Sequence, residues 1–256
     1  MELIDRVDRH FVFRANACGA AGRFTRVFES ESTYDLPVQS SVTLPVTGGI
    51  ANSAFAGYQQ ADGALNLVLS GPILCRASTQ EDDAAKTTRT TVSAEASDVR
   101  VYGGLQIPYL KAALESSSVG SDTVAGIRTA DCVLNEIRLG DRVVKVDLDM
   151  DTFHRHDTID AVNTHCAHRT DYRRTGKGVL VAHIVKSVSL LGEPDKSIRV
   201  VPPNKIYWDN FGWIIVGEIL ISAQYRRLTM VRLELGSPVA GKLALGEVET
   251  NGHTVP

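Results

Sequence analysis

The sequence contains no hydrophobic run long enough to cross a lipid bilayer as a helix. Its most apolar stretch, residues 213–223, includes Gly217 and Glu218 and is roughly half as long as a membrane-spanning helix must be. The first ten residues mix acidic and basic side chains, which excludes the apolar centre of a secretory signal. We therefore expect a cytoplasmic protein that makes no contact with a membrane.

The chain also lacks an excess of either charge. It has 27 Lys and Arg against 30 Asp and Glu, for a formal net charge of −3, whereas nucleic-acid-binding domains usually carry a basic excess. We therefore expect no nucleic-acid partner. Cysteine is scarce as well: Cys18, Cys75, Cys132 and Cys166 are far apart and form no C-x-x-C pair. Without a secretory signal, such residues are expected to be free, buried thiols.

Sequence motifs of the common enzyme classes are missing. We find no G-x-S-x-G nucleophile turn, no G-x-G-x-x-G dinucleotide-binding turn and no G-x-x-x-x-G-K-[ST] phosphate-binding loop. Ser, His and Asp side chains that meet only in space would escape such a search. The sequence therefore leaves open whether the protein is an enzyme.

Strand patterns, in contrast, recur at short intervals along the whole chain. The clearest covers residues 144–151, where apolar and charged residues strictly alternate. This segment is part of residues 142–151, which together with residues 132–139 flank the turn dipeptide Gly140-Asp141 and predict a β-hairpin. We expect an all-β protein, an antiparallel β-sandwich or barrel-like double sheet with few short helices. Residues 1–256 are predicted to form a single domain, in which any subdivision would fall near 103–127.

A few segments are predicted to depart from the regular strand pattern. Residues 106–117 begin near Pro108 and are rich in helix formers, which predicts the longest helix. Residues 30–40 and 93–97 are predicted to be loops. Residues 178–191 are apolar and β-branched enough to predict one central strand.

Three aspartates would share one face of the strand at 144–151. Asp147, Asp149 and Asp151 would repel one another there, so a cation or neighbouring arginines should compensate. The glycine and glutamate of an EF-hand loop are missing, and we therefore favour arginine partners. The candidates lie on predicted C-terminal strands and are Arg226, Arg227 and Arg232.

Four of the seven histidines follow shortly after this strand. Imidazole is a common ligand of transition metals, and two histidines at i and i+2 on a strand face the same way. We therefore predict a site for a divalent metal such as zinc, completed by a carboxylate. Its ligands would be His154, His156, His165, His168 and Asp157. The competing interpretation, which the sequence favours, is an exposed polar loop, because the spacing matches no established ligand motif.

A basic, glycine-containing segment follows the histidines. Guanidinium groups and the backbone N–H groups of such a loop can bind phosphate, which predicts an anion-binding site at Arg169, Arg173, Arg174 and Lys177. The competing interpretation, which the sequence favours, is a solvated loop or a contact between subunits.

Both tryptophans lie in one short aromatic segment. Trp208 and Trp213 flank Asp209-Asn210, and their rings could stack on a sugar or another planar ligand. The sequence favours a simpler interpretation, in which the rings form cross-strand pairs of a hairpin.

The sequence as a whole favours a non-catalytic structural or binding protein that self-associates. The reasons are the missing catalytic motifs and the long apolar strands near the C-terminus, which another sheet or another copy of the chain must cover. One alternative is a metal-dependent hydrolase or oxygenase built on the histidines. A second is a carbohydrate-binding module that uses the two tryptophans.

Overall fold

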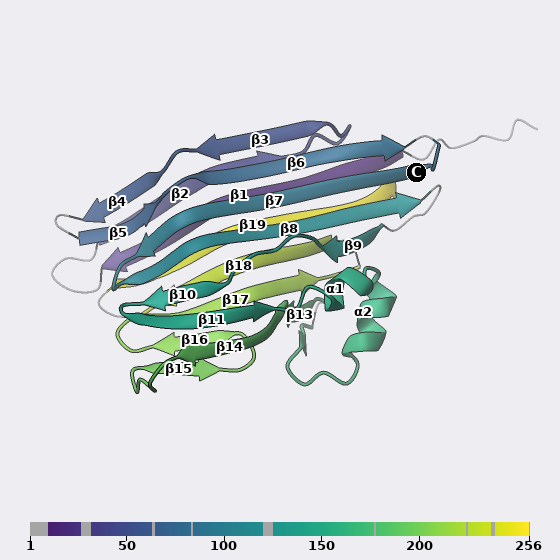
Figure 1. The fold of residues 1–256 in the computed structure, drawn as a ribbon. Helices are drawn as coiled ribbons and strands as arrows, with labels where there is room; N and C mark the ends of the chain where they lie inside the picture. Colours follow the sequence, from purple (N-terminus) through teal and green to yellow (C-terminus); the bar gives the residue numbers. More distant parts are fainter. Residues whose placement is uncertain are drawn as a thin grey trace, which may run out of the picture.

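The computed structural model describes residues 10–26, 32–62, 65–82, 84–119, 125–176, 178–223, 225–236 and 239–255. The chain is 69% strand and 6% helix, and its two antiparallel sheets pack face to face (Figure 1). This confirms the predicted all-β double sheet with few short helices. No helix in the described ranges is long and apolar enough to cross a membrane.

Sheet A contains the first two strands and the C-terminal third of the chain. Its order is β12 (Arg173–Arg174), β13 (Leu180–His183), β17 (Gly212–Ile221), β18 (Tyr225–Leu235), β19 (Val239–Val255), β1 (His10–Arg26) and β2 (Ser32–Thr43). Beside the first half of β17 the sheet continues into β16 (Lys205–Trp208) and β15 (Ile198–Val201).

Sheet B is formed mainly by the middle of the chain. Its order is β14 (Val185–Leu191), β11 (Arg142–Leu148), β10 (Glu136–Leu139), β8 (Leu105–Val119), β7 (Thr87–Val101), β5 (Leu65–Ser70) and β4 (Tyr58–Asp62). Three further strands pair outside this path: β3 (Ile50–Phe55) with β6 (Ile73–Asp82), β6 with β7, and β9 (Gly126–Thr129) with β8. Helices α1 (Thr152–Arg155) and α2 (Ile159–Cys166) lie together at one corner (Figure 1).

The core lies between the two sheets, and small side chains let them approach closely. A single cluster of buried apolar residues includes side chains of both sheets. At Gly19 of β1, a Cβ atom would lie 2.0 Å from the Ile73 side chain of β6, so only glycine fits there. The single-domain assignment stays a prediction, and one cooperative unfolding transition is the measurement that tests it.

The apolar C-terminal strands face this core. Leu228, Leu233, Leu245 and Val248 of β18 and β19 are buried, and β19 contacts β7 and β8 of the opposite sheet. A second sheet of the same chain therefore covers these strands. These strands therefore do not need a second copy of the chain to cover them. Self-association stays a prediction, and it would have to use a different surface.

The predicted hairpin is present, but both strands are shorter than predicted, since the first begins at Glu136 and not at Cys132. Strands β10 and β11 pair antiparallel, with Leu139 opposite Arg142 across the two-residue turn. Strand β11 ends at Leu148, because Asp149 accepts hydrogen bonds from the backbone N–H groups of Asp151 and Thr152. The last two aspartates therefore belong to the entry into α1.

The predicted pairing of the three aspartates with C-terminal arginines is wrong. Asp147 accepts a hydrogen bond from Ser187 and lies 3.2 Å from the Lys145 ammonium. Asp149 caps the turn before α1, and Asp151 pairs with Arg155 at 3.4 Å. The three arginines lie in the other sheet, and each carboxylate has local partners instead.

The helix predicted at 106–117 is a strand. Residues 105–119 form β8, which pairs with β7 along nearly its whole length and with β9 and β10 on its other side. Inward-facing Leu110, Ala112 and Leu114 are buried. Pairing on both sides and burial of alternate residues outweigh helix propensity, which is a weak preference.

Two other segments also differ from expectation. The single strand predicted at 178–191 divides at Ile184 into β13 of sheet A and β14 of sheet B, so the chain crosses between the sheets there. The serine-rich loops predicted at 30–40 and 93–97 lie in β2 and β7 wherever the structure describes them. Ser93 and Ser97 are half-buried in β7 and Ser40 is buried in β2, so serine content alone does not indicate a loop here.

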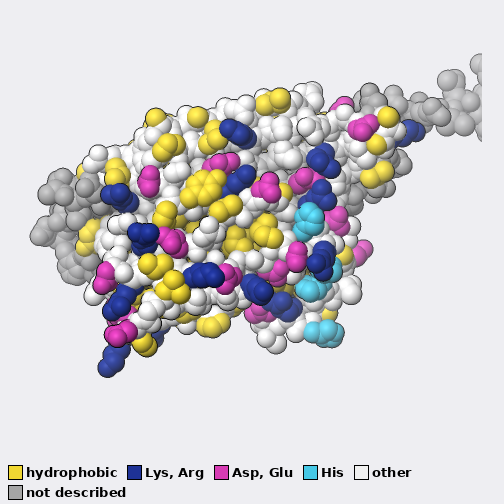
Figure 2. Space-filling view, in the orientation of Figure 1, with side chains coloured by type: hydrophobic (Ala, Val, Ile, Leu, Met, Phe, Trp, Pro, Cys, Tyr) yellow, Lys and Arg dark blue, Asp and Glu magenta, His cyan; other side chains and the backbone are white. Residues whose placement is uncertain are grey.

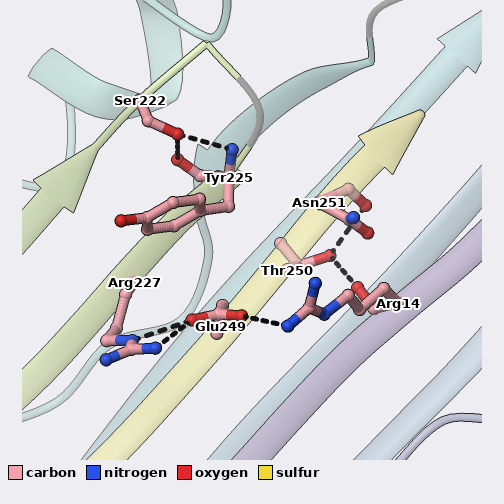
Figure 3. Close-up of polar contacts among 7 residues, drawn as sticks. All are labelled: Arg14, Ser222, Tyr225, Arg227, Glu249, Thr250 and Asn251. Carbon is pink, nitrogen blue, oxygen red and sulfur yellow. Dashed lines mark hydrogen bonds and ion pairs between the residues drawn. The ribbon is translucent and has the colours of Figure 1, made fainter. Parts of the chain in front are cut away.

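The outer face of sheet A carries charged side chains in rows across its strands. Figure 3 shows one row, in which Glu249 of β19 lies between Arg14 of β1 and Arg227 of β18. A second row joins Arg232 to Glu218 and Glu234. Cross-strand pairs of opposite charge stabilise a solvent-facing sheet surface, so Arg227 and Arg232 have partners within their own sheet.

Candidate functional site

An open groove of about 840 Å³ lies on the outer face of sheet B, and we call it the β8 groove. Its floor is formed by side chains of β8 that point away from the core, Tyr109, Lys111 and Glu115. Residues 128–133 form one wall, and Met150, Asp151 and His154 close one end. The volume falls in the range of small-molecule sites. Figure 2 shows basic and acidic side chains interleaved around apolar ones on this face.

The wall exists because the chain beside β8 does not form one continuous strand. Strands β9 and β10 pair with β8 at separate places, and between them Val133 makes an isolated bridge to Lys111. Asp131 adopts φ +43° between β9 and this bridge, a conformation typical of irregular turns. Residues 130–132 therefore depart from regular pairing with β8, and the segment 128–133 borders the groove.

Polar side chains on the groove floor are held by partners on β7. The Tyr109 hydroxyl donates a 3.0 Å hydrogen bond to Glu95, and the Lys111 ammonium lies 3.8 Å from the same carboxylate. The Tyr109 side chain is therefore fixed at its tip, and the residue remains 36% exposed.

A second group of charges is paired on the other side of the floor. Glu115 accepts a short hydrogen bond from Arg128 and forms an ion pair with Arg89 at 3.3 Å. Only 12% of the Glu115 side chain is exposed. The carboxylate of Glu115 thus bridges two guanidinium groups, and such charge-assisted contacts hold the side chains in defined directions. The floor therefore presents fixed polar groups whose charges largely compensate each other.

His154, one of the predicted site residues, lies at the end of the groove. Its Nδ1 is 3.3 Å from the carbonyl oxygen of Thr129. A carbonyl oxygen only accepts hydrogen bonds, so this contact places the proton of the neutral ring on Nδ1 and leaves Nε2 as an acceptor. His154 therefore offers a hydrogen-bond acceptor at the groove.

The groups of the groove that could act as nucleophiles are held protonated. Burial raises the pKa of the Cys132 thiol to about 11, and Cys132 donates to the carbonyl of Ala113. Burial and the hydrogen bond to Glu95 raise the pKa of Tyr109 to about 12. Only the thiolate of cysteine is an effective nucleophile, so this lining favours binding over covalent chemistry.

A buried arginine fixes the helices that close the groove. Arg226 of β18 is 2% exposed, and it donates to the backbone carbonyls of Phe153, His156 and Asp157 at 3.4, 2.8 and 2.6 Å. These acceptors lie in α1 and in the linker to α2. Burial lowers the pKa of Arg226 to about 10. One guanidinium thus joins the helical corner to the sandwich.

The segment after α2 is anchored by a second polar cluster. His183 is 4% exposed; its Nε2 lies 3.1 Å from Asp171, and its Nδ1 accepts from the N–H of Val185 at 3.3 Å. Both ring nitrogens are occupied, so this His–Asp pair leaves no free base. Burial lowers the pKa of His183, against the opposing effect of Asp171.

Arg169 completes this cluster. It donates to Asp171 at 2.8 and 2.6 Å and lies over the Tyr172 ring at 4.5 Å. The hydrogen bonds from Arg169 hold the pKa of the Asp171 carboxyl well below its ordinary value. The cluster therefore holds the segment between α2 and β12 against β13.

The predicted metal ligands are only partly brought together. The rings of His156 and His165 stack with centroids 4.4 Å apart, and Figure 2 shows histidines gathered at this corner. His154 faces the groove, and His168 lies in the exposed turn after α2. In the described ranges, no three His, Cys, Asp or Glu side chains are close enough to share a metal ion. Asp157 follows His156 in the linker between the helices.

The predicted placement of His154 and His156 on a strand is wrong. His154 lies in the last turn of α1 and His156 follows that helix, so the two rings do not share a strand face. The Nε2 of His165 is buried without a hydrogen-bond partner among the described residues. Burial and the neighbouring His156 lower the pKa of His165. The pair of His156 and His165 is what remains of the predicted site.

Two guanidinium groups of the predicted anion-binding loop already bind partners within the protein. Arg169 is bound to Asp171, and Arg174 donates to Asn163 at 2.6 Å. Arg173 is exposed in β12, and Lys177 lies outside the described residues. Anion binding by this loop stays a prediction.

The two tryptophans lie in a hairpin, as the favoured interpretation predicts. Tyr207 of β16 is opposite Trp213 of β17, with ring centroids 5.0 Å apart. Trp208 stacks on Phe211 at 5.3 Å and packs against the core. Each indole therefore has an aromatic partner within the protein, and ligand stacking on them stays a prediction.

Sequence reasoning missed the groove floor. Tyr109, Lys111 and Glu115 fall in the segment predicted as a helix. The signal that could have found them is the alternation of Leu110, Ala112 and Leu114 with more polar neighbours, which has the period of a strand. Arg128 could not have been found, because only the pairing of β9 with β8 places it opposite Glu115.

Comparison with known proteins gives a family. No curated protein and no solved structure matches the chain. The model of a domain of unknown function, DUF8256, matches residues 11–186. That match covers β1, all of sheet B up to the first residues of β14, the β8 groove and both helices. The chain therefore belongs to the DUF8256 family.

Proposed function

We propose that this chain is a non-catalytic binding protein that holds a neutral, polyhydroxylated small molecule, such as a saccharide, in the β8 groove. The observation that carries the proposal is the floor of the groove, where an exposed Tyr109 ring lies beside side chains already fixed by ion pairs. Sites for small ligands combine an apolar surface with a few polar groups in set positions.

The ion pairs on the floor of the β8 groove favour a neutral ligand. Lys111 is paired with Glu95, and Arg128 with Glu115, so an anionic ligand would have to displace an existing carboxylate partner. Hydroxyl groups can instead use the remaining donor and acceptor positions of these ions and the free Nε2 of His154. The face of Tyr109 can cover the C–H side of a sugar ring.

Saturation-transfer NMR and calorimetry with a panel of neutral mono- and disaccharides test this proposal. We expect at least one of them to bind with a Kd of about 1 mM or tighter, and sugar phosphates and free amino acids to bind more weakly. Tyr109→Ala should weaken binding roughly tenfold, because stacking on an aromatic ring contributes about 1–3 kcal/mol. Tyr109→Phe should retain most of the affinity.

Phe55→Ala is the matched control, because it removes a ring of similar exposure, 42%, outside the groove. It should leave saccharide affinity unchanged. Tighter binding of the charged compounds would refute the neutral ligand class. Saccharide binding that is insensitive to Tyr109→Ala would refute the groove as its site.

A further inference from the structure

A long stretch of the chain contains no charged residue. Residues 36–61 include no Asp, Glu, Lys, Arg or His, although 22% of the whole chain is charged. At that fraction, a stretch of this length in an ordinary soluble protein holds about six charges. The stretch covers most of β2, all of β3 and β4 up to its last residue.

These strands form one side of the sandwich (Figure 1). β2 is the last strand of sheet A, while β3 and β4 follow each other along the border of sheet B. β3 pairs with β6 and β4 with β5, and no strand of the described ranges pairs with their other side. The β3–β4 edge, residues 50–61, is therefore open.

The direction of the free backbone groups follows from the register. Thr79 donates to the carbonyl of Gly49 at 2.9 Å, so the residues bonded to β6 are the odd-numbered ones. Hydrogen-bonded and non-bonded pairs alternate in an antiparallel ladder. Asn52 and Ala54 therefore direct their N–H and C=O groups away from β6, where another strand can bind.

Exposed apolar side chains surround this edge. Ile50 is 75% exposed and Phe55 42%, and Val46 and Val38, at 64% and 56%, lie on the same stretch. They are half of the eight large apolar side chains that are exposed in the described ranges. Sheet edges are normally protected by lysine, proline or a covering segment, and β3 contains neither residue.

We propose that the β3–β4 edge pairs antiparallel with the same edge of a second copy of this chain. A two-fold dimer places a segment against itself, and any charge on it would meet the same charge across the axis. A segment without charges is compatible with its own copy, whereas it offers no charge with which a different partner could be selected. The two B sheets would then form one continuous sheet.

Light scattering during size-exclusion chromatography tests this proposal. At about 50 µM the wild-type chain should elute with twice its mass of 27.7 kDa. Ile50→Lys combined with Asn52→Lys should raise the dimer dissociation constant roughly tenfold or more, because like charges then oppose each other. Val119→Lys is the matched control, a similar change at a 57% exposed site of β8, and it should remain dimeric.

Oxidative cross-linking gives a second measurement that does not depend on the charged variants. Ile50→Cys, Asn52→Cys and Ala54→Cys are made singly and oxidised with copper–phenanthroline. At least one should form a reducible covalent dimer, and Val119→Cys should not. The native thiols give little background, because burial raises the pKa of each.

A monomeric wild-type protein at this concentration would overturn the proposal. So would a dimer that keeps its affinity in the lysine variant and forms no cross-link through any of the three cysteines. Saccharide binding in the β8 groove is independent of both outcomes, since the groove lies on a different part of sheet B.

Discussion

The guanidinium of Arg226 donates a 2.6 Å hydrogen bond to the backbone carbonyl of Asp157. The donor lies on β18 in sheet A, and the acceptor lies in the linker between the two helices. Arg226 also donates hydrogen bonds to the carbonyls of Phe153 and His156. Through these three bonds, sheet A positions the helical segment that closes one end of the β8 groove on sheet B. A single buried cation therefore joins the two layers to the candidate site.

Removal of this cation should destabilise the protein strongly. Arg226→Met leaves three carbonyl oxygens without their charged donor, and lost hydrogen bonds to a charged group cost roughly 1.5–3 kcal/mol each in buried sites. We expect a loss of about 3 kcal/mol or more in the free energy of unfolding, measured by urea denaturation. Saccharide affinity in the groove should fall as well, because His154 lies on the helix that Arg226 holds.

Arg227→Met is the matched control at the next residue, which points to the opposite face of β18. The side chain of Arg227 is 43% exposed. In the variant, its partner Glu249 would still form an ion pair with Arg14, which lies 3.6 Å away. We expect a cost of about 1 kcal/mol or less, as for other partly exposed ion pairs. Equal losses for the two variants would contradict the anchoring role of Arg226.

Stability should fall as the solution becomes mildly acidic. Burial lowers the pKa of His183 below the ordinary value of 6.5, while Asp171 opposes this change and Arg169 supports it. The unfolded chain therefore binds a proton at His183 before the folded chain does. The corresponding stability is complete above pH 6.5 and is lost as the pH falls from 6.5 towards the lower folded pKa.

Urea midpoints measured between pH 8 and pH 5 check this expectation. His183→Gln should be less stable than the wild type at pH 8 and should lose less stability on acidification. His165 also has a lowered pKa, so His165→Gln is measured in parallel to separate the two contributions. A wild-type profile that stays flat over this range, or an unchanged slope in His183→Gln, would count against the assignment.

Measurements of zinc binding distinguish the four-histidine site predicted from the sequence from the stacked pair of His156 and His165 in the structure. Two stacked imidazoles supply at most half of a tetrahedral shell. We therefore expect weak binding that His165→Ala abolishes and His154→Ala leaves unchanged, measured by thermal shift and elemental analysis. Stoichiometric zinc that is lost in either variant would instead support the site predicted from the sequence.

Saccharide binding at the two tryptophans and saccharide binding in the β8 groove predict opposite effects of tryptophan substitutions. Because each indole already packs on another ring, Trp208→Phe and Trp213→Phe should retain saccharide affinity within about twofold. Intrinsic fluorescence of the wild type should change little on titration. Loss of binding in either variant would favour the aromatic hairpin over Tyr109 as the binding surface.

Local sequence patterns were sufficient for much of the fold. The alternation at 144–148 and the Gly140-Asp141 turn predict the β10–β11 hairpin, because side-chain direction in a strand and the geometry of a two-residue turn depend on near neighbours alone. Free, buried cysteines were expected because a secretory signal and a C-x-x-C pair are both missing; all four are free, and all but Cys18 are buried.

The candidate site could not be predicted from local patterns. Helix formers at 106–117 suggested a helix, and only pairing with β7, β9 and β10 makes that segment a strand and turns Tyr109 and Lys111 to the surface. The histidines could be recognised as unusual, but their separation into a groove residue and a stacked pair depends on how α1 and α2 pack.

Local sequence is enough to specify antiparallel sheets in this chain, since strand periodicity and turns are properties of a few adjacent residues. Which strands meet, and therefore where charges and rings gather, depends on long-range packing. Arg226 shows the reason: its partners are about 70 residues away in sequence, and such long-range hydrogen bonds form only once both layers are in place.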